Sequence, residues 1–373
     1  MFNSRRTRLT KTLIVAIFLA TLVLAGCAGT RSWPGTISEE GVLYVGTMDG
    51  RVLALNPDSG SRKWDWQPTG GSGQSSLFAC AGGSTLVGGF LYGAPAVASG
   101  KVFVAYHTGK VYTIDATSGV QQWEYDLKSN VSGGVAAGNN TVFVGSSNGK
   151  LSALDVVNGA LKWQFSTENE IWATPVIVDG VVYIGSLDHS LYAVNAADGT
   201  KKWSFKTGGS IASTPLIVEG VIYIGSFDDK FYAIDADTGA KKWVFEGAGN
   251  WFWAQAAYGN GTIYAGCLDH KVYALNAGNG TTVWSKPFDA ASLIKASPVI
   301  AGGNLVVASE VGKVFGLDLN TGEKKWEFDS ITAKVLSPLG AVGNTVYINS
   351  QDNKLYAVDG QTGRQVWGVP LTK

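Results

Sequence analysis

The feature that most constrains the fold of this chain is a nine-residue pattern, Asp or Asn-x-x-x-Gly-x-x-x-Trp, which occurs eight times. Its tryptophans are Trp64, Trp123, Trp163, Trp203, Trp243, Trp284, Trp326 and Trp367. Successive members are 59, 40, 40, 40, 41, 42 and 41 residues apart. A fixed period of this size is typical of repeat architectures, in which each repeat is one supersecondary unit. The 373 residues are therefore predicted to form one repetitive body rather than several unrelated domains.

Each repeat contains four short β-rich runs separated by turns. In the repeat that begins at Trp172, these runs cover residues 174–178, 181–186, 190–194 and 201–205. Val, Ile and Tyr dominate the runs, and Gly, Asp and Asn fill the turns, which predicts an antiparallel meander. One small sheet cannot bury both of its faces, whereas eight sheets in a ring can. We therefore predict an all-β fold, an eight-bladed β-propeller of four-stranded antiparallel blades.

The repeated pattern itself is predicted to be structural. The Asp or Asn side chain can bond to the backbone two residues on, and the Gly can then take the left-handed conformation. The eight tryptophans carry a large apolar ring with one N–H to place, so we expect them to bridge neighbouring blades and to donate to a carbonyl there. Blade 8 is expected to close the ring on blade 1, and a strand exchange at that seam is left open.

The first residues have the composition of a secretory signal. Four basic residues precede an apolar run over 13–24 that is short for a permanent membrane span: Arg5, Arg6, Arg8 and Lys11. The run ends in Leu-Ala-Gly-Cys, which resembles the bacterial lipobox and implies lipidation of Cys27; the alternative is an ordinary signal peptide cleaved nearby. We expect a lipoprotein signal peptide over 1–26, a lipidated tether over 27–32 and the propeller over 33–371.

Charge and cysteine content exclude some classes of function. Without residues 1–26, the chain has 25 basic residues against 29 acidic residues. A nucleic-acid-binding protein would need a basic stripe instead. Cys80 and Cys267 are the remaining cysteines, and a disulfide between them is left open.

The repeat resembles that of a known family. The consensus G-x-[VI]-Y-[VI]-G-S-x-D-x-x-[LF]-Y-A-[VIL]-[DN]-A-x-[TD]-G-x-x-x-W is similar to the PQQ-type propeller repeat. With eight blades and a lipobox, the chain resembles the BamB family of outer-membrane β-barrel assembly lipoproteins. That resemblance implies a non-enzymatic, membrane-anchored, extracytoplasmic scaffold without a cofactor. Its implied partners are the assembly machinery and nascent barrel proteins. It would lie on the periplasmic face of an outer membrane, or on the cell surface of a host with one membrane.

Two other functions are left open. The same repeat occurs in quinoprotein dehydrogenases, and that resemblance would imply a PQQ-dependent oxidoreductase with Ca²⁺-bound pyrroloquinoline quinone. Such enzymes often carry a vicinal disulfide, and this chain has neither a Cys-Cys pair nor a Cys-x-x-Cys-His motif. A cell-surface propeller that binds polysaccharide or protein is the third interpretation.

Residues specific to this protein are expected on one face of the ring. In a meander, the turns between second and third strands share a face with the connections from blade to blade, and these connections vary most. Alignment of the repeats places one residue of each connection beside the central channel: Trp33, Tyr92, Ser132, Trp172, Ala212, Trp253, Lys295 and Val335. The candidate binding funnel, for a peptide, a glycan or a planar ligand, consists of Trp33, Tyr92, Trp172, Trp251, Trp253 and Lys295. The alternative is that these side chains pack between inner strands.

The first repeat spacing places about nineteen extra residues within 67–90, between blades 1 and 2 and on the same face. Their Gly/Ser-rich start predicts a flexible linker. A long loop on a rigid scaffold is a candidate for function, and the alternative is a tolerated surface insertion.

Other motifs are interpreted as structural. His107, His189 and His270 fall in or beside turns of different blades, so a shared metal is not expected. Asp235-x-Asp237-x-Gly239 resembles the start of a calcium loop, but the other repeats do not keep the second acid, which favours a plain Asx turn.

Overall fold

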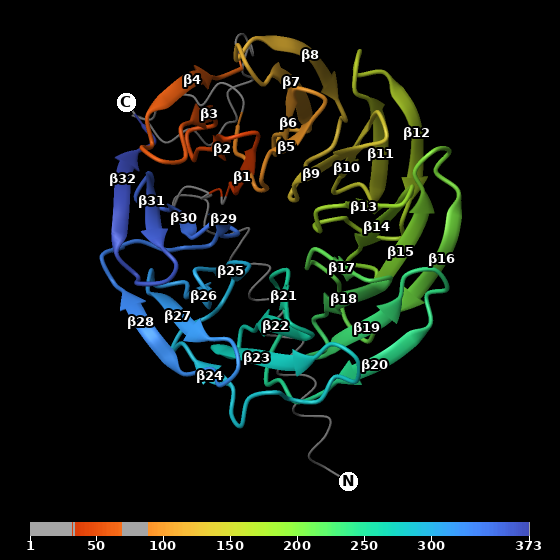
Figure 1. Cartoon of the computed structure of the whole chain (residues 1–373). Helices are drawn as coiled ribbons and strands as arrows, with labels where there is room; N and C mark the ends of the chain where they lie inside the picture. The colour runs from red at the N-terminus through yellow and green to blue at the C-terminus, as the bar shows by residue number, and fades with distance from the viewer. Residues whose placement is uncertain (1–31, 33, 69–88, 373) are drawn as a thin grey trace, which may run out of the picture.

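The computed structural model describes residue 32, residues 34–68 and residues 89–372. Within these ranges, thirty-two strands form eight four-stranded antiparallel sheets around a central axis, and no helix is present (Figure 1). This confirms the predicted all-β, eight-bladed propeller. Accordingly, the described residues contain no helix long and apolar enough to cross a membrane. Cys27, Trp33, Cys80 and most of the 67–90 insertion lie outside the described residues.

Each blade consists of four strands that are consecutive in the sequence. Blades 1 to 4 contain β1 (Thr36–Glu39), β2 (Val42–Gly46), β3 (Val52–Leu55), β4 (Arg62–Trp66); β5 (Ala96–Ala98), β6 (Lys101–Ala105), β7 (Lys110–Asp115), β8 (Gln121–Asp126); β9 (Val135–Gly138), β10 (Thr141–Gly145), β11 (Lys150–Asp155), β12 (Leu161–Ser166); β13 (Val176–Val178), β14 (Val181–Gly185), β15 (Ser190–Asn195) and β16 (Lys201–Lys206).

Blades 5 to 8 follow the same order. They contain β17 (Leu216–Val218), β18 (Val221–Gly225), β19 (Phe231–Asp235), β20 (Lys241–Phe245); β21 (Ala257–Gly259), β22 (Thr262–Gly266), β23 (Lys271–Asn276), β24 (Phe288–Asp289); β25 (Val299–Ala301), β26 (Asn304–Ala308), β27 (Val314–Asp318), β28 (Lys324–Phe328); β29 (Gly340–Val342), β30 (Thr345–Ser350), β31 (Lys354–Asp359) and β32 (Gln365–Pro370).

The turns adopt the backbone conformation that their residues favour. At the tip between second and third strands, the second turn residue has a positive φ in every blade, from 59° at Asn353 to 97° at Gly312. Between third and fourth strands, the glycine of the repeated pattern has φ between 69° and 76°. Glycine reaches this left-handed region at low steric cost, and Asn, Asp and His reach it more readily than other residues, which explains why these residue types occupy these positions.

The repeated tryptophan joins each blade to the next. Its Nε1 donates to the carbonyl of the residue that follows the Asp or Asn of the next repeat, at 2.9–3.1 Å in all eight blades. The last of these bonds runs from Trp367 of blade 8 to Pro57 of blade 1. In five blades a tyrosine hydroxyl of the second strand donates to the same carbonyl.

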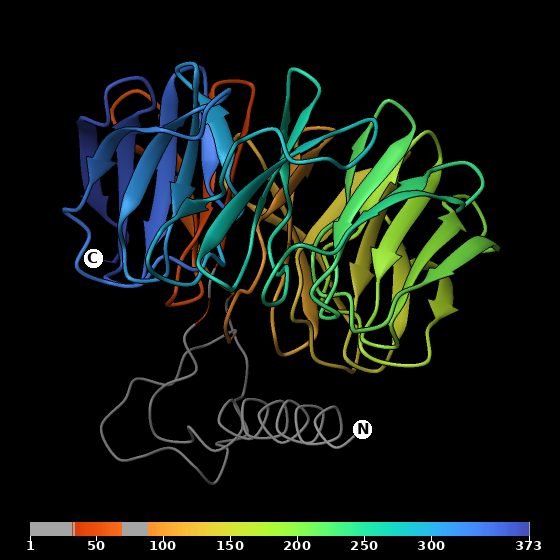
Figure 2. The same ribbon diagram turned by 90° about the horizontal axis from the view of Figure 1, so that it is seen from below.

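The core lies between blades rather than inside one of them. Among the described residues, eight buried apolar clusters occur, one at each boundary between neighbouring blades. The inner strands line the axis, and neighbouring inner strands such as β5 and β9 contact each other (Figure 1). Figure 2 shows the ring from the side, with turns and connections at its two opposite faces. Each blade is therefore stable only together with its neighbours.

The ring closes without strand exchange. The sheets of blades 1 and 8 contain only their own four strands. Their contact is supplied by side chains: Asn349 Nδ2 donates to Pro34 O and to Gly46 O, both at 2.9 Å. Arg51 donates to Leu371 O at 2.6 Å. This answers the question that the sequence left open about the seam.

Candidate functional site

The topology gives the ring two chemically different faces. The turns between second and third strands, at residues 49–50, 108–109, 148–149, 188–189, 228–229, 269–270, 311–312 and 352–353, lie on the same face as the connections between blades. We call this the variable face, because the connections differ in length and sequence. The opposite face carries the repeated Asp or Asn and Gly turns, which are nearly uniform.

Four aromatic side chains of the variable face form a contiguous group, which we call the aromatic cluster: Trp172, Phe227, Trp251 and Trp253. The ring of Phe227 stacks on Trp251 with a centroid distance of 4.4 Å and an interplanar angle of 12°. It also stacks on Trp253, at 5.6 Å and 19°. Trp172 contacts Trp253 at 6.3 Å and 55°. All four side chains are partly exposed, so the cluster offers apolar area to a binding partner.

Burial of Phe252 positions two of these tryptophans. Phe252 is 0% exposed and packs edge-on against Phe231, with ring centroids 5.2 Å apart. Its N–H donates to Ser226 O at 3.4 Å, which anchors the connection to blade 5. Alternate side chains of an extended segment point in opposite directions. The flanking Trp251 and Trp253 therefore lie on the exposed side of the connection.

Trp172 is placed by an equivalent anchor in blade 4. The preceding residue, Ile171, is fully buried, and its N–H donates to Ser146 O at 3.2 Å. The corresponding ring position of blade 5 is Ala212. Because alanine is small, the rings of Trp172 and Trp253 can meet although blade 5 lies between their blades.

The turn that carries Phe227 is held rigidly by Asp228. One carboxylate oxygen accepts hydrogen bonds from Gly208 N at 2.8 Å and from Tyr232 O–H at 2.6 Å. Gly208 belongs to the connection between blades 4 and 5, so this carboxylate ties a turn to a neighbouring connection. Burial, and then the bond to Asp228, raises the pKa of Tyr232, which keeps the phenol protonated. The same pairing recurs in three other blades as Tyr192–Asp188, Tyr273–Asp269 and Tyr356–Asp352.

Acidic groups lie beside the aromatic cluster. Glu170 accepts a hydrogen bond from Trp172 Nε1 at 2.6 Å. Glu168 precedes it by two residues and is exposed, and Asp229 follows Phe227 by two residues. Indole rings beside carboxylates attract cations through both the ring face and the negative charge. The arrangement therefore suits a partner segment that combines apolar with basic side chains.

Lys295 takes part in an internal ion-pair network instead. Its Nζ lies 3.1 Å from Glu310 Oε2, and the other oxygen of Glu310 pairs with Lys334. Burial by itself raises the pKa of the Glu310 carboxyl, but the two ammonium groups outweigh burial and hold this pKa below its ordinary value. At this part of the variable face, the lysine charges are thus partly neutralised by a buried carboxylate.

Tyr92 lies apart from the aromatic cluster. Its ring packs edge-on against His107, with centroids 5.0 Å apart, and burial raises its pKa. His107 Nδ1 is 3.0 Å from Val131 O. Of the predicted funnel, the structure thus brings Trp172, Trp251 and Trp253 together, and it does not join Tyr92 or Lys295 to them. Trp33 lies outside the described residues.

The remaining candidates have structural surroundings. Over the described ranges, no three His, Cys, Asp or Glu side chains are grouped closely enough to hold a metal ion. Asp235 accepts hydrogen bonds from the hydroxyl and the N–H of Thr238, which hold its pKa below the ordinary value, as an Asx-type turn requires. Cys267 is buried, and its thiol donates to Asn250 O at 3.1 Å.

Two features of the variable face differ from the sequence alignment or were missed by it. Phe227 was not predicted as a site residue. It follows the Gly-Ser pair of its repeat, at a turn position where an aromatic residue is a signal that sequence reasoning could have used.

In blade 8, the inner strand β29 pairs with β30 one residue later than the position of the proline implied. The residue that corresponds to Trp172 is therefore Leu336, so the placement of Val335 is wrong by one residue, and Val335 is fully buried.

A family model described as "Outer membrane protein assembly factor BamB" matches three stretches of the chain, residues 28–129, 107–244 and 249–373. Together these stretches span nearly the whole predicted propeller. Among solved structures, BamB from Moraxella catarrhalis is similar, with a TM-score of 0.71 and 18% identity over 88% of this chain and 94% of that chain.

Quinoproteins are similar as well. The structure of quinohemoprotein alcohol dehydrogenase ADHIIG from Pseudomonas putida HK5 has a TM-score of 0.68 and 16% identity, over 88% of this chain and 70% of that chain. A 1-butanol dehydrogenase (cytochrome c) from Thauera butanivorans is 29% identical over 95 residues, which are 23% of this chain and 14% of that protein. The match thus spans about a seventh of that enzyme's length. Identities this low to the solved structures show the propeller fold alone.

Proposed function

The chain belongs to the family of the outer membrane protein assembly factor BamB, and from this premise we propose that it is a non-enzymatic scaffold that binds proteins through its variable face. The observation that carries this proposal is the aromatic cluster, in which three tryptophans and Phe227 are partly exposed and in mutual contact. Tryptophan is enriched among the residues that dominate protein interfaces.

The partners in this proposal are the outer-membrane β-barrel assembly machinery and nascent barrel proteins. The family match over most of the chain supports them. The chain would be held at the membrane by a lipid on Cys27, as its lipobox-like Leu-Ala-Gly-Cys sequence supports. In a host with an outer membrane, the propeller would then lie at its periplasmic face, and in a host with one membrane it would lie at the cell surface.

A rigid base favours this role. The Asp228 and Tyr232 pair fixes the turn below Phe227, and buried Phe252 fixes the connection that carries Trp251 and Trp253. Little conformational freedom is left to lose when a partner binds, so more of the contact energy remains as affinity.

The double variant Trp172→Ala/Trp253→Ala tests the proposal. We expect it to weaken binding of the chain to the periplasmic domains of the host's assembly protein by about thirtyfold or more, because the loss of even one interface hot spot costs about 2 kcal/mol or more. The melting temperature should stay nearly unchanged, since both rings are partly exposed. Binding is measured by isothermal titration calorimetry and stability by circular dichroism.

Tyr92→Ala is the matched control, because Tyr92 is an aromatic residue of the same face outside the aromatic cluster. It should leave binding unaltered. A large fall in melting temperature with unaltered partner binding in the double variant would contradict the proposal.

The second candidate is a PQQ-dependent oxidoreductase, which the quinoprotein relatives favour. Against this candidate, the part of the chain that the structure describes holds no group of three or more acidic, histidine or cysteine side chains that could bind the calcium ion of the quinone. Tight, Ca²⁺-dependent binding of pyrroloquinoline quinone accompanied by dye reduction would overturn the scaffold proposal in favour of this one.

A further inference from the structure

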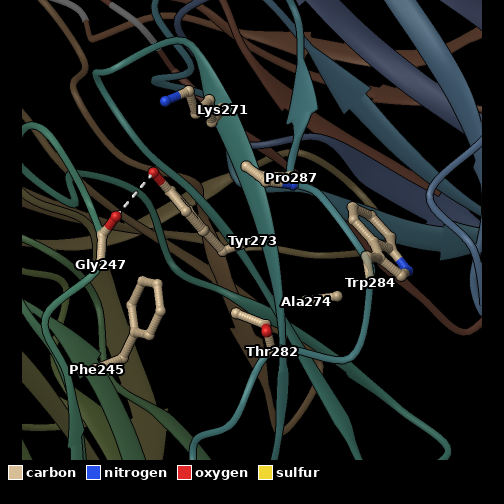
Figure 3. A pocket seen from close by; sticks show the side chains of 8 residues that line it. All are labelled: Phe245, Gly247, Lys271, Tyr273, Ala274, Thr282, Trp284 and Pro287. Atoms are coloured by element: carbon tan, nitrogen blue, oxygen red, sulfur yellow. Dashed lines mark hydrogen bonds between the residues drawn. The ribbon is translucent and has the colours of Figure 1, made fainter.

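A groove at the rim of the ring does not specify a partner by its own side chains. It has a volume of about 240 Å³ and lies beside β23, with Phe245 and Tyr273 among its lining residues (Figure 3). Lys271 also lines the groove, but it lies opposite Asp289 in the ladder between β23 and β24. Residues 281–283 already bond to the edge of β23. Neither a charge nor an open strand edge therefore selects a ligand there, and the more distinctive surface is the aromatic cluster.

Trp172 forms one end of the aromatic cluster. The other three rings stack nearly parallel, since Phe227 makes interplanar angles of 12° with Trp251 and 19° with Trp253. Trp172 is inclined by 55° to Trp253 and, among the described residues, contacts no other aromatic ring. The indole of Trp172 therefore lies outside the stack and has an aromatic neighbour on one side only.

The connection to blade 3 carries only small residues next to Trp172. Its ring position is Ser132, which is partly exposed and is followed by Gly133 and Gly134. A Cβ added at Gly133 would come within 2.7 Å of Trp172 O, so this connection packs closely on the backbone of Trp172. Residues 132–134 have no side chain large enough to cover the indole, which leaves room for a side chain of a partner.

A carboxylate lies at the edge of the same indole. Trp172 Nε1 donates to Glu170 Oε2 at 2.6 Å, whereas the eight repeated tryptophans donate to backbone carbonyls. Within residues 34–68 and 89–372, no ion pair involves Glu170, in contrast to Glu310, which pairs with Lys295 and Lys334. The negative charge of Glu170 is thus available to a cation of a partner.

Carboxylates predominate on the elements packed around Trp172. The turn of blade 4 bonds to the connection that carries Trp172, since Leu187 N donates to Glu170 O at 2.9 Å. The turn of blade 5 contributes Phe227 to the cluster. The charged or titratable side chains of these turns and of the flanking connections and strand ends are Asp126, Lys128, Glu168, Glu170, Asp188, His189, Lys206, Asp228 and Asp229. Because acids outnumber bases here, the field around Trp172 favours a basic ligand.

We propose that Trp172 and Glu170 form a subsite of the aromatic cluster that binds an arginine side chain of the partner segment, an inference that rests on the proposed function. The guanidinium stacks on the indole face and donates to the carboxylate at the edge of the ring, while apolar neighbours of the arginine contact the stacked rings. Lysine fits less well, because its ammonium is a point charge without a planar face to stack. The two lysines that share Glu310 lie beyond Trp253, so the arginine is favoured at the Trp172 end of the cluster.

The test uses three fluorescein-labelled heptapeptides, which have a leucine on each side of a central arginine, lysine or citrulline and serine elsewhere. Citrulline has nearly the shape of arginine but no charge. Fluorescence anisotropy with the full chain should show that the arginine peptide binds tighter than the citrulline peptide by about tenfold or more, with the lysine peptide between them.

Glu170→Gln should remove this preference. The glutamine amide oxygen can still accept the hydrogen bond from Trp172 Nε1, so the variant removes the charge and keeps the position of the ring. The arginine peptide should then bind as weakly as the citrulline peptide, whose affinity should stay unaltered. Glu246→Gln is the matched control, because it makes the same change of net charge at the rim of blade 5, where Glu246 pairs with Lys230. It should leave the preference for arginine unaltered.

Circular dichroism melting checks that the variants fold, and Trp172→Leu, which should also remove the preference for arginine, decides if Glu170→Gln does not fold. An unaltered preference in Glu170→Gln, or absence of binding up to roughly 1 mM, overturns the proposal. Glu170-dependent dimerisation in sedimentation velocity also overturns it, since the occupant would then be a second copy.

The same peptides separate this proposal from the proposed function. Equal binding of all three peptides that is lost in Trp172→Ala/Trp253→Ala contradicts the arginine subsite alone and leaves the apolar binding surface in place. Peptide binding that the double variant does not change contradicts the proposed function as well.

Discussion

Single residues of the repeated pattern serve two purposes at once. Gly239 has φ of +73°, which its turn requires, and it lies against the tryptophan of the preceding blade. A Cβ added at Gly239 would come within 2.7 Å of Cδ2 of Trp203. The same contact between glycine and tryptophan recurs at all eight blade boundaries. The pattern therefore describes a joint between repeats as much as a turn inside one.

Gly239→Ala and Gly220→Ala separate these two purposes. Both glycines have φ of +73°, but an added Cβ at Gly220 meets no atom within 4 Å. Gly220→Ala should cost about 1–2 kcal/mol for the left-handed conformation alone. Gly239→Ala should cost about 1–3 kcal/mol more, because the ring of Trp203 must move. Urea unfolding followed by tryptophan fluorescence measures both, and equal destabilisation would contradict the packing role.

At the scale of elements, aspartate carboxylates in the turns between second and third strands bond to the connection that precedes their blade. Asp269 accepts hydrogen bonds from Tyr273 O–H at 2.6 Å and from Gly249 N at 2.9 Å, and Gly249 belongs to the connection that leads to Trp251. Burial raises the pKa of Asp269, but these hydrogen bonds outweigh burial and the pKa lies below its ordinary value. The ionised carboxylate thus stabilises the base of the aromatic cluster.

This depressed pKa predicts a dependence of stability on acid. Because the pKa is lower in the folded chain than in the unfolded chain, the contribution of Asp269 is complete above the unfolded pKa of about 3.9. It is lost as pH falls through the folded pKa. Asp269→Asn should therefore reduce the slope of unfolding free energy against pH below about pH 4. Urea unfolding of both proteins from pH 7 to pH 2 measures this slope, and parallel curves would contradict the assignment.

For the whole molecule, the seam is the boundary at which the repeat must close on itself. In blades 3 to 6, the glycine that ends the second strand lies against a buried anchor of the next blade, as Gly185 does against Ile211. At the seam, Asn349 occupies the position of that glycine and reaches two carbonyls of blade 1 with its amide. Polar side chains thus replace a covalent or strand-exchanged closure.

Asn349→Gly should open this boundary first. Loss of the two hydrogen bonds leaves buried carbonyls without these donors, and we expect a cost of about 1–3 kcal/mol. Hydrogen exchange followed by mass spectrometry should show faster exchange in β1, β2, β29 and β30 than in other blades.

Asn304→Ala is the control, because Asn304 donates to Gly360 O across the boundary between blades 7 and 8. It should destabilise the chain without faster exchange in β1 and β2. Uniform exchange in Asn349→Gly would contradict the role of the seam.

Periodicity predicted the propeller because each turn and each bridging tryptophan depends on a few residues close together in the sequence. Asp235, Gly239 and Trp243 illustrate this, since spacing alone assigns them a turn and an interblade contact. The candidate binding funnel stays a prediction. Lys295 has the expected ring position, but its partner Glu310 lies on another element and could not be identified by spacing.

The sequence by itself determined the number of blades, the strand order and the face on which the repeats stop agreeing, because these properties follow from local patterns that recur every 40 residues or so. Only the tertiary structure decided which side chains of that face meet. Trp172 and Trp253 come from different blades and touch because Ala212 is small, and Phe227 joins them from a turn. Contacts between residues distant in the chain depend on the shapes of all the neighbours, which no single repeat encodes.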